Sequence, residues 1–136
     1  MNRHLHRLLH EERGSVSVLM AFAVALAVLL LAFVTTVHGR NDAQSRADAL
    51  ASEAARAALT AVNTRGTTVT IDTAGAQTAA RHYLVAAGVP GTVTITSPTT
   101  VTVTVTVDRP AVFTVFGATY HATATENAVL VTGPHA

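Results

Sequence analysis

The 136-residue sequence contains no cysteine and no lysine, since all nine of its basic residues are arginine. Without cysteine the chain forms no disulfide bond and no thiolate site, and cysteine usage gives no information about the redox compartment. Charged residues make up only 12% of the chain and the formal net charge is +1, whereas about a quarter of the residues in soluble proteins are charged. A nucleic-acid-binding protein needs a basic patch, which this near-neutral chain cannot supply.

Catalytic and cofactor-binding motifs are also missing. The sequence has no P-loop, no dinucleotide fingerprint, no G-x-S-x-G elbow and no HExxH. Three histidines lie close together in "NRHLHRLLH", which we interpret as a weakly basic tail and not as a metal site. No partner base or acid for catalysis is placed near His82 and Tyr83, which we interpret as a surface histidine beside a packed tyrosine. We therefore predict no catalytic residues, no metal and no cofactor, and treat an exported enzyme of unknown type as the least favoured alternative.

The sequence does contain one long apolar stretch. Val18 to Val34 is an unbroken apolar run, and Ser15 to Val37 contains no charge. A helix of this length extends roughly 34 Å, enough to cross a hydrocarbon core of about 30 Å. A cleavable signal peptide has a shorter apolar region and a small-x-small cleavage site, and a helix in a soluble core has a polar face. The stretch matches neither alternative, so we predict a transmembrane helix over residues 15–37.

The orientation of this helix follows from what lies on its two sides. Three arginines precede it, at positions 3, 7 and 13, and three follow within the next twenty residues, at positions 40, 46 and 56. The positive-inside bias is therefore slight. The short N-terminal segment favours a cytoplasmic tail over residues 1–14, with everything after Val37 exported across a cell membrane that the chain crosses once.

Residues 38–63 predict a second helical segment, rich in alanine, that continues from the first. Small apolar residues recur there at spacings of three and four, the period of a helix face. Alanine is the strongest helix former, and Gly39 is a candidate kink. The predicted packing stripe consists of Ala43, Ala47, Leu50, Ala54, Ala57 and Ala61. This stripe either covers the sheet of its own domain or also packs against neighbouring subunits.

Residues 64–136 predict a small α/β head. A short strand in 64–73 is followed by a helix over 73–88, which Gly88 and Pro90 terminate. Valine and threonine then alternate through residues 91–110, which predicts an antiparallel hairpin with its turn at Ser97 and Pro98. We expect the valines to face the helices and the threonines to face water. Residues 111–117 form either a core plug or a membrane contact, and 118–133 a final strand.

The chain as a whole resembles pilins and pseudopilins, and in detail the TadE/TadG-like proteins of Flp (Tad) pilus systems. Three stretches carry the resemblance: "ERGSVSVLMAFAVALAVLLLAF", "QSRADALASEAARAAL" and "VTVTVTVDRPAVFTVFGATYHATATENAVL". They correspond to the family's charged and apolar start, its alanine-rich segment outside the membrane, and its closing strands. The resemblance implies a pilin-like α+β fold, in which the transmembrane helix continues into the alanine-rich helix and packs on a small antiparallel sheet.

The resemblance also implies a function in pilus assembly, surface attachment or secretion. Its expected partners are the membrane, pilus or secretion-system subunits, and other copies of the chain. Family processing would cleave between Gly14 and Ser15, and the fifth residue after that point is Leu19, where pilin-like leaders typically carry glutamate. This departure leaves a permanently anchored minor subunit open beside entry into a filament. The alternative function is that of a membrane-anchored exported binding protein unrelated to pili.

Overall fold

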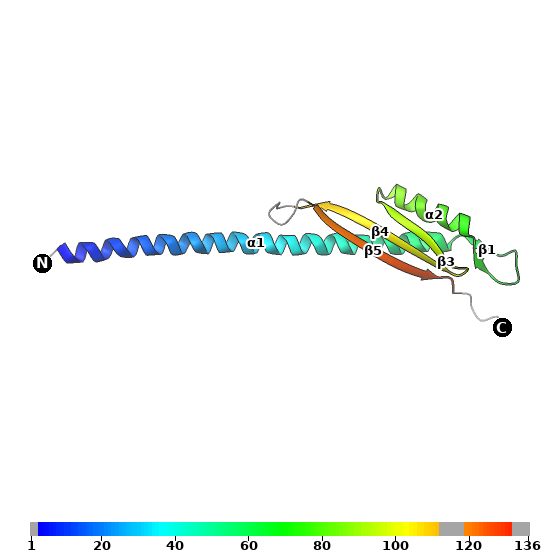
Figure 1. The fold of residues 1–136 in the computed structure, drawn as a ribbon, viewed down its shortest axis with the longest axis horizontal. Coiled ribbons are helices and arrows are strands. Elements are labelled where there is room, and N and C mark those ends of the chain that lie inside the picture. Colours follow the sequence, from blue (N-terminus) through cyan, green and yellow to red (C-terminus); the bar gives the residue numbers. More distant parts are fainter. Residues whose placement is uncertain (1–2, 112–118, 132–136) are drawn as a thin grey trace. The chain divides into compact units, whose positions relative to one another are not determined.

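The computed structural model describes residues 3–111 and 119–131, and the side chains within them from residue 16 onward. Its elements are α1 (Arg3–Leu59), β1 (Val62–Asn63), β2 (Thr70–Ile71), α2 (Thr73–Ala86), β3 (Gly91–Ser97), β4 (Thr100–Pro110) and β5 (Thr119–Val129) (Figure 1). The predicted α+β class is confirmed. The chain divides into two compact units, Met1–Val37 and His38–Ala136, and each is described by itself.

The first unit is the N-terminal part of α1. Its large apolar side chains lie open, and the exposed fractions of Leu19 and Phe22 are 73% and 71%. The hydroxyls of Thr35 and Thr36 donate to main-chain carbonyls one turn earlier, at 3.0 and 2.8 Å, so neither hydroxyl needs water. Within the described residues there is one helix long and apolar enough to cross a membrane, and it lies near the N-terminus.

The second unit contains a three-stranded antiparallel sheet with the strand order β3-β4-β5. The predicted hairpin is present as β3 and β4, with Pro98 and Thr99 between the strands. The predicted final strand is present as β5, which pairs with β4 along its whole length, from Thr100 opposite Val129 to Pro110 opposite Thr119. The β3–β4 pairing is shorter and shifts register between Ile95 and Ser97.

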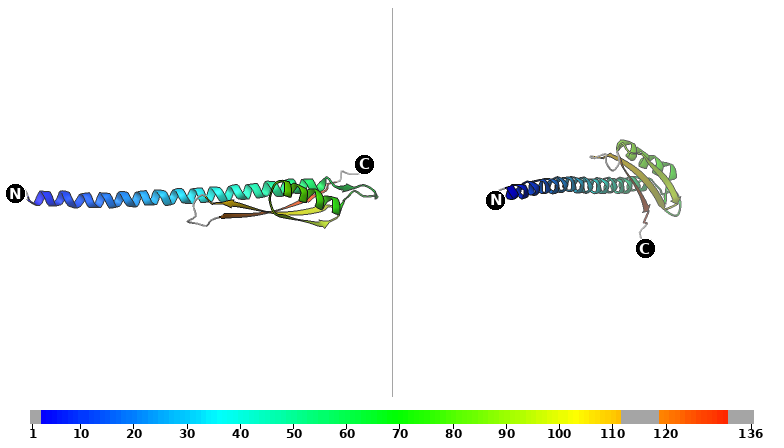
Figure 2. Two further views of the ribbon diagram at one scale, coloured as in Figure 1. Left: turned by 90° about the horizontal axis from the view of Figure 1, so that it is seen from above. Right: turned by 60° about the vertical axis from the view of Figure 1, so that its left-hand side comes forward.

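The alternation of valine and threonine divides the sheet into two faces. Val101, Val103 and Val105 have no exposed surface, while the threonines between them are half-buried. Both helical segments of this unit, α1 from residue 38 and α2, share one hydrophobic core with these valines. Figure 2 shows both segments lying along the sheet. Each valine stabilises the fold by roughly 1.5 kcal/mol or more through burial. The predicted assignment of the two faces is thus correct.

Helix α2 supplies the rest of the core through Ala76, Ala80 and Leu84. It ends in a Schellman motif, in which the amide of Gly88 donates to the carbonyl of Val85 and the amide of Val89 to that of Leu84. Gly88 has a φ of 68°, a left-handed conformation that glycine adopts without strain. Gly88 therefore terminates α2, as predicted. The last helical residue is Ala86, two residues before the predicted boundary.

The end of α1 and the first short strands differ from the prediction. Helix α1 ends at Leu59 and does not continue to residue 63, because Val62 and Asn63 form β1 and pair with β2. The strand predicted within 64–73 is only Thr70–Ile71. Ladders of two residues depend on their tertiary partners, so sequence periodicity does not reveal them. Of the predicted plug 111–117, Ala111 is half-buried and the other residues lie outside the described part.

Candidate packing surfaces

The alanine face of α1 lies against the sheet of its own unit. Ala43, Ala47 and Ala54 have no exposed surface, whereas Leu50, Ala57 and Ala61 are only half-buried. Three further alanines are buried that the predicted stripe does not include: Ala51, Ala55 and Ala58. Because nine of the 26 residues in 38–63 are alanine, more than one choice of alanines fits the period of a helix face. Of the predicted stripe, Leu50, Ala57 and Ala61 keep surface that a neighbour could contact.

Small residues on α1 let the sheet approach closely. A Cβ atom added to Gly39 would lie 2.6 Å from Cε2 of Tyr120, well inside the contact distance of two carbon atoms. Tyr120, on β5, is itself 6% exposed, so its ring has little freedom to move away. α1 continues through Gly39 as helix, and the role of this glycine is to make room for an aromatic ring.

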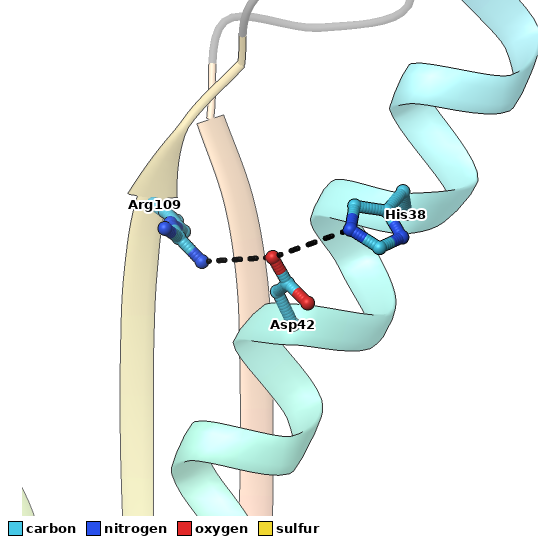
Figure 3. A network of polar contacts seen from close by, with 3 residues as sticks. All are labelled: His38, Asp42 and Arg109. Atoms are coloured by element: carbon cyan, nitrogen blue, oxygen red, sulfur yellow. Dashed lines mark hydrogen bonds and ion pairs between the residues drawn. The ribbon is translucent and has the colours of Figure 1, made fainter.

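A polar network joins the start of this unit to the end of β4. Asp42 Oδ2 accepts a hydrogen bond from Nη1 of Arg109 at 3.3 Å and lies 3.9 Å from Nε2 of His38 (Figure 3). All three side chains are substantially exposed, so water and salt screen the charges. Such a pair contributes about 1 kcal/mol or less. Its effect is to hold α1 in register with β4 at a modest energetic gain.

A groove of about 710 Å³ lies between α1 and α2. Half of its lining is alanine, from Ala57 on α1 and Ala74, Ala79 and Ala86 on α2, and the rest is Gly75, Thr78, His82 and Tyr83 on α2. His82 is exposed and Tyr83 half-buried, as predicted for a surface histidine beside a packed tyrosine. The groove extends the open part of the alanine face onto a second helix.

The face of the sheet opposite the helices carries regularly placed hydroxyls. We define this threonine face as Thr92, Thr94, Thr96, Thr102, Thr104, Thr106, Thr123, Thr125 and Asn127. Residues in register across the strands point to the same side, and several of these side chains bond to each other. The closest such contacts are Thr102 to Asn127 at 2.7 Å, Thr96 to Thr102 at 2.9 Å and Thr104 to Thr125 at 3.0 Å.

Asp108 and His121 extend the same face at one end. Their side chains lie opposite each other in the β4–β5 ladder and pair at 2.7 Å between Oδ1 and Nδ1. Between residues 16 and 131, so far as the structure describes them, no group of three or more histidine or acidic side chains could hold a metal ion. The same residues leave no buried side-chain nitrogen or oxygen without a hydrogen-bond partner.

The predicted cleavage point falls within helix α1, where Gly14 and Ser15 both lie. Comparison with known proteins finds no matching family model, no similar curated protein and no similar solved structure. The described residues form three candidate contact surfaces: the exposed apolar part of α1, the alanine groove and the threonine face.

Proposed function

We propose that this protein is a membrane-anchored, pilin-like subunit that acts by packing, as a minor subunit or assembly factor of a Flp/Tad-type pilus or secretion system. The observation that carries the proposal is the exposed apolar surface of α1 in the first unit. Leu19, Phe22 and Leu29 each expose more than half of their surface. A soluble domain does not leave a continuous surface of this kind in water, and lipid would cover it.

The second unit supports a role in packing. Its helix is the continuation of the same α1, and its sheet covers the alanines of that helix. Ala57 and the alanines of α2 leave a groove of small side chains, a surface on which another helix can approach closely. In this proposal residues 1–14 lie in the cytoplasm, residues 15–37 cross the membrane, and the unit from His38 onward lies outside the cell.

Extraction of isolated membranes with alkaline carbonate tests the anchor. The full chain should remain in the membrane pellet and be released only by detergent. Release by carbonate alone would overturn the anchor, and with it the pilus-subunit role. Determination of the N-terminal residue of the extracted protein then decides whether the chain is cleaved after Gly14.

Site-specific cross-linking tests the packing role. Because the chain has no cysteine, single cysteines can be placed at Ala57, which is half-buried beside the groove, and at Ala47, which is covered by the chain's own sheet. Ala57→Cys should cross-link in membranes to an identified pilus or secretion subunit, and Ala47→Cys should not. Absence of cross-links at Ala57→Cys, in cells whose pili and attachment survive deletion of the gene, would reject the pilus role.

A further inference from the structure

We propose that the threonine face is the contact surface between the exported units of two copies of this chain. The inference rests on the membrane anchoring proposed above. It adds the face, the symmetry and the partner, none of which follows from anchoring itself. The two copies would stack sheet on sheet, with a two-fold axis along the strands and Thr104 close to that axis.

The chemistry of the face suits contact with another protein. It carries no charged residue from Thr92 to Asn127 except the paired Asp108 and His121 at one end. Its hydroxyls bond across the strands, with Thr104 to Thr125 at 3.0 Å and Thr106 to Thr123 at 3.4 Å. A hydroxyl that already has a protein partner loses less when water is removed than an unpaired one, and the threonine methyl groups supply apolar contact.

The size of the face is sufficient for a dimer of anchored chains. Strands spaced about 4.8 Å apart with a rise of about 3.3 Å per residue give the three strands a footprint of roughly 450 Å². Two such faces bury roughly 900 Å², slightly less than the about 1,000 Å² expected of a specific interface between proteins free in solution. Two copies held in one membrane also meet at a high effective concentration, so a small interface is enough.

The direction of the strands selects the face over the edge of the sheet. In each copy the second unit begins at His38, and Gly39 lies against Tyr120 near the first residue of β5. A two-fold axis along the strands places these entry points at the same end, as a shared membrane requires. Antiparallel pairing of two β5 edges would place them at opposite ends, and the side chain of Gln44 already donates to the carbonyl of Thr123 at that edge.

The other unpartnered surface, the alanine groove, gives no comparable argument. Its lining is made of small side chains from α1 and α2, and neither charge nor strand direction selects an occupant for it. A two-fold contact through the threonine face, in contrast, keeps the entry points of both copies on the side of the shared membrane.

Single cysteines in the otherwise cysteine-free full chain test the inference. Thr104→Cys, on the threonine face, should form a cross-linked dimer in membranes under mild oxidation or with a short bismaleimide. Thr68→Cys is the control and should stay monomeric, because Thr68 is exposed in the segment between β1 and β2 and lies outside both the threonine face and the alanine groove. Maleimide labelling in detergent confirms that both thiols are reactive. Equal cross-linking at the two positions, or none at Thr104→Cys, would overturn the inference.

Substitutions without cysteine give a second readout, the mass of the full chain in mild detergent. Thr104→Val keeps the branched shape and should preserve the dimer, whereas Thr104→Glu places two carboxylates beside the axis and should give monomers. A circular dichroism spectrum equal to that of the unmodified chain confirms that each variant folds. Retention of the dimer by Thr104→Glu, or cross-linking of Thr104→Cys only to another protein, would reject the contact between copies. Carbonate extraction reports on the anchor independently.

Discussion

The two halves of α1 share one helical backbone and differ in the size and burial of their apolar side chains. From residue 16 to 37 the large apolar side chains are open, with Leu19 exposing 73% of its surface, and only the smaller Ala32 and Thr36 are buried. From residue 38 to 59 the apolar residues are mostly alanine, and Ala43 and Ala47 expose none. The first half therefore leaves its large apolar side chains open, while the alanine face of the second half is covered by the sheet.

The comparison shows that side-chain size decides what can cover a helix. Alanine allows a sheet to lie directly on the helix surface, so a head of fewer than a hundred residues suffices to bury it. Leucine and phenylalanine present a thicker apolar surface, for which the described part of the first unit supplies no cover. Substitutions that change the size or the burial of these side chains test this difference between the two halves. The largest loss of stability is expected where the substitution disrupts the sheet that covers the alanines.

Val103→Asp should unfold the second unit, because it places a carboxylate on the face of β4 that covers the alanines. Val103 has no exposed surface, and an unpaired buried charge costs more than roughly 4 kcal/mol. Thr104→Asp, one residue further on the opposite face, should cost about 1 kcal/mol through lost strand propensity. Urea denaturation of the full chain in detergent, followed by circular dichroism, measures both. Equal losses of stability from the two substitutions would mean that β4 does not have one buried and one open face.

Val28→Arg should weaken the proposed anchor without affecting the second unit. Val28 lies in the middle of the apolar stretch and exposes 59% of its surface. A charge at the centre of a membrane-spanning helix costs about 2.5–3.5 kcal/mol on insertion scales. The fraction of chain released by alkaline carbonate should rise, while Val28→Leu should behave as the unmodified chain. Unchanged retention of Val28→Arg would place the centre of the membrane elsewhere on the helix.

Ala47→Leu should give the second half of α1 a side chain of the size found in the first half. Ala47 has no exposed surface and lies under the sheet, so the larger side chain overpacks the core and costs about 1–3 kcal/mol. Ala57→Leu, at the half-buried edge of the groove, should cost little stability. Thermal unfolding in detergent distinguishes the two. A milder effect at Ala47 than at Ala57 would contradict the burial of the alanine face.

Gly39→Ala should destabilise by about 1–2 kcal/mol, because its Cβ would meet the ring of Tyr120 at 2.6 Å. The same substitution in a helix without this contact gains about 0.5–1 kcal/mol from helix propensity. The sign should therefore reverse in a Tyr120→Ala background, where the ring is absent. A double-mutant cycle with unfolding free energies measures this coupling, and a zero coupling energy would rule out the contact.

Asp42→Asn should have the smallest effect, about 1 kcal/mol or less, since its partner Arg109 and the network around it are exposed. The difference from the unmodified chain should shrink as salt is raised from low concentration, because exposed charges are screened. Unfolding measured at two ionic strengths checks this. A loss that is larger and independent of salt would mean that Asp42 supports the α1–β4 contact by packing.

Much of the second unit could be predicted because its sequence patterns are compatible with only one type of secondary structure. Val101 to Val107 alternate with threonine at period two, and Gly88 marks the end of α2. The alanine stripe was less certain: Ala51, Ala55 and Ala58 are buried although the predicted stripe omits them. Alanines lie on more than one face of this helix, so periodicity does not select the face that the sheet covers.

The sequence by itself determined the long apolar helix, the α+β class, the hairpin and the division of the sheet into valine and threonine faces. These features depend on local propensity and on periods of two or about 3.6 residues, which are properties of neighbouring residues in the chain. The tertiary structure alone decided which alanines are covered, why Gly39 is glycine, where α1 ends and how β1 meets β2. Each of these depends on a contact between residues far apart in sequence, such as Gly39 with Tyr120, and no local pattern records such a contact.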